Sequence, residues 1–370
     1  MNFPLQSRTT SKLLTGVLGA GAMTAFAGGA LFLAGDIGTK YEKDITYAVN
    51  YSQTATSETT AMEMLIDGEP LEGRGFGGGG GRETTFSFDY TDTILAASEG
   101  APTKIKREFG EAAGGMSMEM RGEAMEMELA SAFDGMTLTL TEKDGEVEVE
   151  VTDGEAPEDE RLNGHWMALA IDGLLPEDEV EAGDEWDIEG EDLAKALGLG
   201  VQRILLDRPE RAEPEGGEGG GRRRGRGGMR GGTGGAADML AGGDWEVTAK
   251  MTEETEEVDG VECAVIEIKA EVSGSPPQRE RGQGRRDRAA GPTSLQQEAR
   301  QESSFSGEFE GKLLWNVEGS CPVSFSFEGK AELNSEMVRE TQRGLMERSS
   351  TQEISLDINV TVEAGKAESK

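Results

Sequence analysis

Methionines at alternating positions are the most distinctive chemical feature of the sequence. They form two groups around a short polar stretch: Met116, Met118 and Met120, then Met125 and Met127. Thioether side chains are flexible and soft, so this stripe can line an adaptable apolar groove or, with other soft ligands, hold copper. Because no histidine or cysteine lies nearby, the sequence favours methionine as the filling of one sheet face. We therefore expect no metal site and no cofactor.

The other reactive side chains give little support for catalysis. The only histidine, His165, stands beside Trp166, and the sequence contains no Gly-x-Ser-x-Gly nucleophile turn. One histidine and two distant cysteines cannot supply a zinc site, and no phosphate-binding or dinucleotide-binding glycine loop is present. Carboxylates are dense in residues 153–160 and 177–192 but lack the spacing of a calcium-binding loop. The sequence predicts a protein that is not an enzyme.

The two cysteines, Cys263 and Cys321, allow two interpretations. They can pair as a disulfide in an oxidising compartment, or they can be two small buried apolar side chains. A disulfide requires a short Cα separation, which sequence spacing does not reveal. Both interpretations stay open at this level.

The N-terminal segment differs from the rest of the chain. Arg8 and Lys12 precede a run from Leu13 to Gly35 that carries no charge until Asp36. Ala25-Phe26-Ala27 fits the small-x-small cleavage pattern, which favours a signal peptide over residues 1–27. The alternative is an uncleaved membrane anchor over residues 13–35, because the run reaches the roughly 20 residues that span a bilayer. We expect an exported protein of the periplasm or cell envelope, in contact with a membrane only through this segment.

Charge separates the body of the chain from two arginine-rich tracts. The formal net charge of −36 repels nucleic acid and anionic membrane surfaces. Residues 213–237 and 273–292 are rich in glycine and arginine, a composition that buries too little apolar surface to offset chain entropy. We predict that both tracts are disordered insertions. Binding of nucleic acid or another anionic polymer through them is a weaker hypothesis, because they lack aromatic residues for base stacking.

Apolar and polar residues alternate through most of the chain, which predicts β-strands. These strands must position the side chains discussed above. Asp144-Gly145 and Asp259-Gly260 lie between alternating runs and predict tight hairpin turns. A further hairpin is expected around Arg121-Gly122-Glu123-Ala124, between the two methionine groups. We expect roughly ten to fourteen strands, mostly antiparallel because the connections are short. The clearest alternating runs are 45–51, 86–90, 136–151, 245–251, 261–265, 305–317, 323–327 and 354–362.

The predicted fold is mainly β, with curved antiparallel sheets in two lobes, a few short helices at the joint, and Gly/Arg-rich disordered loops. Residues 41–161 form the N-terminal lobe and residues 201–365 the C-terminal lobe. The joint, residues 162–200, contains the break Gly183-Asp184-Glu185-Trp186 and a helix-forming stretch at 191–197 that Gly198 is placed to end.

A set of turn and strand-entry residues recurs in a recognisable order: Leu175-Pro176, Gly183-Asp184, Trp186, Gly260, and the run from Gly307-Glu308-Phe309 to Gly319. In these residues the sequence resembles a family of exported bacterial β-rich proteins of uncharacterised role. Families of this kind are similar to the lipoprotein-carrier superfamily, in which a curved antiparallel sheet cups an acyl chain. This resemblance covers residues 134–362 and implies no catalytic residues, and the Gly/Arg-rich insertions depart from it.

Two functions of different class follow from these observations. The first is a binding module with a shallow apolar groove in residues 84–151, lined by Met118, Met120, Met127 and Leu138, for a lipid-like ligand or an envelope protein partner. The groove requires four alternating runs to join as one meander. The second is a structural envelope or surface protein whose apolar faces are all buried by packing and which binds no ligand.

Overall fold

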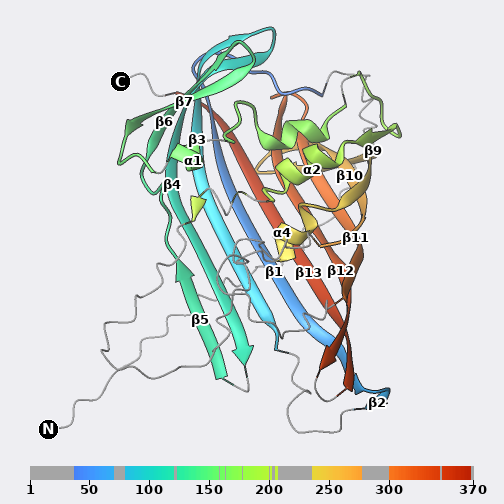
Figure 1. The fold of residues 1–370 in the computed structure, drawn as a ribbon. Coiled ribbons are helices and arrows are strands. Elements are labelled where there is room, and N and C mark those ends of the chain that lie inside the picture. The colour runs from blue at the N-terminus through green and yellow to red at the C-terminus, as the bar shows by residue number, and fades with distance from the viewer. Residues whose placement is uncertain are drawn as a thin grey trace, which may run out of the picture. The chain divides into compact units, whose positions relative to one another are not determined.

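The protein folds around one large antiparallel sheet, seen in a computed structural model (Figure 1). The structure describes residues 37–367, except 71–79, 121–122, 158, 163, 177, 200, 202–204, 207–235, 277–299 and 342–343. The predicted signal peptide or anchor lies outside the described residues. The sheet has 13 strands, which agrees with the predicted strand number and the predicted mainly β class.

The strands are long because alternation continues for many residues without a break. Their bounds are β1 Ile45–Ile66, β2 Glu69–Pro70, β3 Arg82–Ser98, β4 Ala101–Met120, β5 Glu123–Leu129, β6 Thr137–Lys143, β7 Glu146–Asp153, β8 Glu185–Ile188, β9 Asp244–Val258, β10 Val261–Gly274, β11 Arg300–Asn316, β12 Cys321–Thr341 and β13 Gly344–Lys366.

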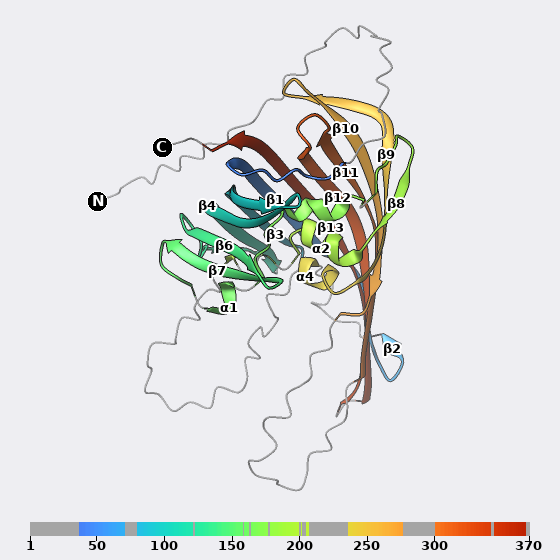
Figure 2. The ribbon, with the colours of Figure 1, turned by 90° about the horizontal axis from the view of Figure 1, so that it is seen from above.

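The first and last long strands pair with each other and make the sheet continuous. The order is β7-β6-β4-β3-β1-β13-β12-β11-β10-β9-β8, with β2 beside β1 and β5 beside β4. β1 pairs with β13 from Ile45 opposite Lys366 to Ile66 opposite Met346. The two predicted lobes therefore supply adjoining parts of one sheet, and the edge strands β7 and β8 stay apart (Figure 2).

Glycine-containing turns connect neighbouring strands as predicted. Asp144-Gly145 joins β6 to β7 and Asp259-Gly260 joins β9 to β10, and all four residues have positive φ. The hairpin between the methionine groups also forms, but its turn is tighter than expected, because Glu123 already pairs with Met120. The predicted four-strand meander is wrong: β5 and β6 pair with different parts of the same strand, β4.

One face of the sheet carries the hydrophobic core. We call it the core face, and it includes Tyr51 on β1, Phe88 on β3, Phe327 on β12 and Ile358 on β13, all of them buried. Positions that alternate with these side chains form the opposite, outer face, where glutamate, lysine, serine and threonine prevail. The helices lie on one side of the sheet, which curves around α2 and α4 (Figure 2).

Short helices in the middle of the chain cover part of the core face. They are α1 Asp159–Leu162, the 3-10 helix η1 Ala170–Leu174, α2 Gly190–Ala196 and α4 Ala236–Leu240. α2 matches the helix predicted at 191–197, and Gly198 follows it with positive φ. Its contact with the sheet includes a hydrogen bond from the Tyr51 hydroxyl to the carbonyl of Leu197. Among the described residues, no helix is long and apolar enough to cross a membrane.

The two Gly/Arg-rich tracts lie largely outside the described residues. α4 begins at Ala236 and β10 ends at Gly274, so each predicted tract overlaps an ordered element by two residues. Residues 275 and 276 are described and belong to no helix or strand, and the other residues of the two tracts, whose disorder we predict, lie outside the described residues.

Candidate functional site

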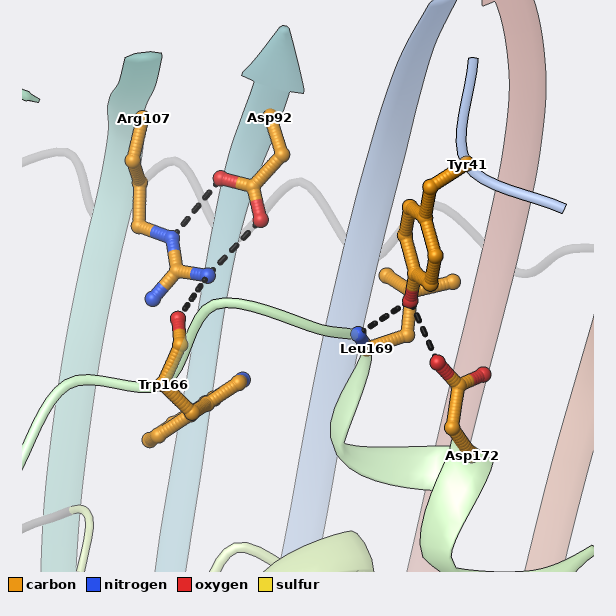
Figure 3. Close-up of polar contacts among 6 residues, drawn as sticks. All are labelled: Tyr41, Asp92, Arg107, Trp166, Leu169 and Asp172. Atoms are coloured by element: carbon orange, nitrogen blue, oxygen red, sulfur yellow. Dashed lines mark hydrogen bonds and ion pairs between the residues drawn. The ribbon is translucent and has the colours of Figure 1, made fainter. Parts of the chain in front are cut away.

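The segment from His165 to Leu175, which we call the strap, crosses the core face and is tied to it by a buried ion pair. Arg107 on β4 donates from Nε to Asp92 Oδ1 over 2.8 Å and from Nη2 to Oδ2 over 2.7 Å. The two side chains are only 1% and 2% exposed. The same Nη2 donates to the carbonyl oxygen of Trp166 over 3.1 Å, so the pair holds the strap as well as β3 and β4 (Figure 3).

Aromatic rings enclose this ion pair. The Arg107 guanidinium lies 4.5 Å from the ring centre of Tyr90 and 5.2 Å from that of Trp166. Burial raises the pKa of Asp92, and Arg107 opposes that shift through its charge and its hydrogen bonds. An ion pair withdrawn from water in this way gives little net stability, but removing one partner leaves the other as an unpaired buried charge. The arrangement is therefore a positioning device for the strap.

A second polar cluster fixes the other end of the strap. Tyr41 donates its hydroxyl proton to Asp172 Oδ2 and accepts a hydrogen bond of 2.6 Å from the backbone N–H of Leu169 (Figure 3). Thr39 donates to Asp172 Oδ1 over 2.5 Å. Burial raises the pKa of Asp172 to about 6, although the hydrogen bonds from Thr39 and Tyr41 act in the opposite direction. Residues before β1 are thereby bound to η1.

The space beneath the strap is almost filled. Two hollows of about 10 and 20 Å³ remain there, both bordered by Phe88, Tyr90 and Trp166. Each has room for roughly one water molecule and none for an acyl chain. His165 borders the smaller hollow, and burial, followed by the charge of Arg107, lowers its pKa to about 4. The sole histidine is thus an uncharged packing residue at neutral pH.

Beyond the strap, the core face continues into methionine side chains. A side chain at Gly114 would clash with Leu206, whose Cδ1 lies 2.5 Å from the point that a Cβ atom would occupy, so Leu206 marks the last covered row. In the next rows Met116 faces Met127 and Met118 faces Met125 across β4 and β5. Met125 is 51% and Met127 38% exposed, although both lie on the core face. We call these four residues the methionine hairpin.

The predicted groove residues do not gather at one place. Met118 and Met127 lie in the methionine hairpin, and the side chain of Met120 is outside the described part of the structure. Leu138 is fully buried on β6, opposite Arg107, roughly 35 Å along β4 from Met118. The β4–β5 part of the predicted groove therefore remains open, and so does Val147 at the far edge of the sheet, which is 37% exposed.

Sequence reasoning missed four further methionines on the same face. The register with β13 places Met62 and Met64 of β1 on the core face. Arg348 donates to the Met62 sulfur over 3.8 Å. Met337 faces Arg348 across β12 and β13, and Met346 faces Ile66. The signal was present as the pair Met62 and Met64, but nothing local connects residue 62 with residue 346.

The outer face has the opposite character. Two grooves of about 890 and 710 Å³ cross it over β10 to β13, and both include Lys269, Glu310 and Glu328. In the larger groove carboxylates outnumber lysines by eight to two, so this groove carries a net negative charge. Among the described residues, no group of three or more histidine, cysteine or acidic side chains is placed to hold a metal ion.

The cysteines are free and buried. Cys263 on β10 and Cys321 on β12 both lie opposite Asn316 of β11, so one strand separates them. Two strand spacings give a Cα separation of about 10 Å, which exceeds the reach of a disulfide. The interpretation as small buried side chains is confirmed.

Comparison with known proteins assigns no family. No protein-family model matches the chain, and no curated protein matches it.

Proposed function

We propose that the protein is a non-catalytic, exported binding module that holds a lipid-like apolar ligand on the open, methionine-lined end of its core face. The observation that carries this proposal is the exposure of Met125 and Met127 on the face that elsewhere forms the core. Contiguous apolar surface left open to water on a folded protein usually serves a binding role.

The shape and chemistry of the site favour an unbranched acyl chain. Methionine side chains have three rotatable bonds and adapt to a flexible ligand better than branched side chains do. Met62, Met64, Met337 and Met346 place further thioethers on the core face of β1, β12 and β13, around Arg348. The resemblance to lipoprotein carriers points to the same ligand class, and the N-terminal segment supports export.

Titration with a fluorescent fatty acid tests the proposal. Saturable binding is expected for the full chain, with loss of affinity when Met118 and Met127 are both replaced by Glu. The matched control is Val338→Glu, because Val338 has the same 38% exposure as Met127 but lies on the outer face. Absence of saturable binding, or equal losses in both variants, would leave the alternative of a structural envelope protein without a ligand.

Export is tested separately by the mass of the protein recovered from its native host. We expect cleavage after Ala27 and a mature chain that starts at Gly28. A chain that still begins at Met1 or Asn2 would support the uncleaved anchor over residues 13–35.

We further propose that the two Gly/Arg-rich tracts add nothing to the stability of the two-lobed sheet. Deletion of residues 213–234, or of 278–292, keeps α4 and β10 intact. Each deletion is expected to leave the midpoint of thermal unfolding within a few degrees. Loss of cooperative unfolding would show that the tract belongs to the folded core.

A further inference from the structure

The methionine hairpin places four thioethers on one side of two adjacent strands. Met116 lies directly opposite Met127, and Met118 lies directly opposite Met125. The intervening positions, Glu126 among them, project to the outer face. The sequence spacing alone shows two stripes, whereas the register makes them a two-by-two array.

The dimensions of this array suit convergence on a single ion. Directly opposite residues have Cβ atoms about 4.5 to 5.5 Å apart, and successive residues on one face of a strand are separated by roughly 6.6 Å. A methionine side chain can turn its sulfur toward the centre of such a rectangle through three rotatable bonds. Partial exposure of Met125 and Met127 leaves the array open to an incoming ion.

The chemistry of thioethers selects the class of ion. Soft sulfur ligands favour copper(I), whereas calcium and magnesium require several oxygen ligands. A thioether is neutral and needs no deprotonation, in contrast to the thiol or imidazolium groups that bind metals only after losing a proton. Glutamates on the reverse side of the hairpin, Glu119, Glu126 and Glu128, lower the local potential without supplying ligands. Arg82, directly opposite Met118 on the core face, raises it.

We propose that Met116, Met118, Met125 and Met127 form a binding site for a soft monovalent metal ion, copper(I) or silver(I). This site goes beyond the proposed function, since it uses the sulfur atoms and not the apolar surface. The lack of nearby histidine or cysteine, which argued against copper at the level of sequence, is compensated by the four thioethers that the hairpin register brings together.

The test is competition for copper(I) against a chromophoric copper(I) chelator, under anaerobic reducing conditions and with the full chain. Wild-type protein is expected to withdraw one equivalent of copper(I) from the chelator. The quadruple variant M116L/M118L/M125L/M127L, in which leucine keeps the size and apolarity of each side chain, is expected to lose this competition. The double variant M125L/M127L changes only exposed side chains and should therefore fold. It is also expected to lose the competition, so the test remains decisive if the quadruple variant does not fold.

Two matched variants assign the site. M337L/M346L removes two thioethers elsewhere on the core face, and C263A/C321A removes both thiols; each is expected to compete like the wild type. X-ray absorption at the copper edge is expected to show sulfur ligands only, and affinity is expected to be equal at pH 5 and pH 7.5. Failure of the wild type to compete, loss of binding in the cysteine variant, or retention in the quadruple variant would overturn the proposal.

The leucine variants also separate this site from the lipid-like ligand. Because leucine keeps the surface apolar, they are expected to retain saturable binding of the fluorescent fatty acid, at reduced affinity, while losing copper(I) altogether. Loss of fatty acid binding in the Met118→Glu, Met127→Glu protein thus bears on the proposed function alone.

Discussion

Arg107 and Asp92 form a two-hydrogen-bond ion pair that is almost completely withdrawn from solvent, between β4 and β3 of the sheet. The same guanidinium bonds to the Trp166 carbonyl, so the strap depends on this pair for its position. Desolvation costs several kcal/mol per ion, so a buried ion pair is a costly way to fill space. Its role here is to hold the strap in position.

Removing one partner of this pair is expected to be much more harmful than removing both. Asp92→Asn or Arg107→Met should each lower the free energy of unfolding by about 3 to 5 kcal/mol, because the remaining group loses its partner in a buried site. The double variant D92N/R107M should lose less than the sum of the single changes. Urea unfolding of the four proteins measures this coupling, and additive losses would contradict it.

Asp172 and His165 are expected to give opposite pH dependences. The folded-state pKa of Asp172 is raised from 3.8 to about 6, so its contribution to stability is complete below pH 3.8 and is lost as pH rises through 6. The folded-state pKa of His165 is lowered from 6.5 to about 4, so its contribution is complete above pH 6.5 and is lost as pH falls toward 4.

Two variants separate these contributions. Relative to Asp172→Asn, the wild type should lose up to about 3 kcal/mol of stability between pH 4 and pH 7. Relative to His165→Gln, it should gain a similar amount over the same range. Denaturant unfolding at several pH values measures both differences. A constant difference for either pair would show that the residue does not titrate as described.

Trp186 is expected to stabilise the joint through packing more than through its hydrogen bond. Its side chain is half-buried on β8, and Nε1 donates to the carbonyl of Leu174 over 3.0 Å. Trp186→Ala should cost about 3 kcal/mol, and Trp186→Phe, which keeps an aromatic ring, about 1 kcal/mol. Thermal and urea unfolding measure both values. A cost below roughly 1 kcal/mol for the alanine variant would mean that the ring is not packed.

Both cysteines are expected to stay reduced even after export. One strand separates Cys263 from Cys321, and both side chains are buried. Thiol titration of the denatured protein, purified without reductant, should therefore find two free thiols per chain. The unfolding midpoint should not depend on added reductant. Detection of a Cys263–Cys321 disulfide would mean that β11 does not lie between β10 and β12.

Local sequence determined the strands and several of their turns. Alternating side chains define two faces because the strand repeats every two residues, and Asp144-Gly145 and Asp259-Gly260 adopt the positive φ that tight turns need. The same local information located α2 and the methionine stripes. These features depend on residues close in the chain, which is why the sequence sufficed.

Tertiary structure decided how the strands join and which part of a face is covered. Alternation does not state that β1 pairs with β13, that β5 and β6 share β4, or that β11 separates the cysteines. Nor does it distinguish Leu138, buried beside Arg107, from Met127, which stays exposed. Pairing between distant strands and the path of the strap depend on the packing of the whole sheet, and no short stretch of sequence contains that information.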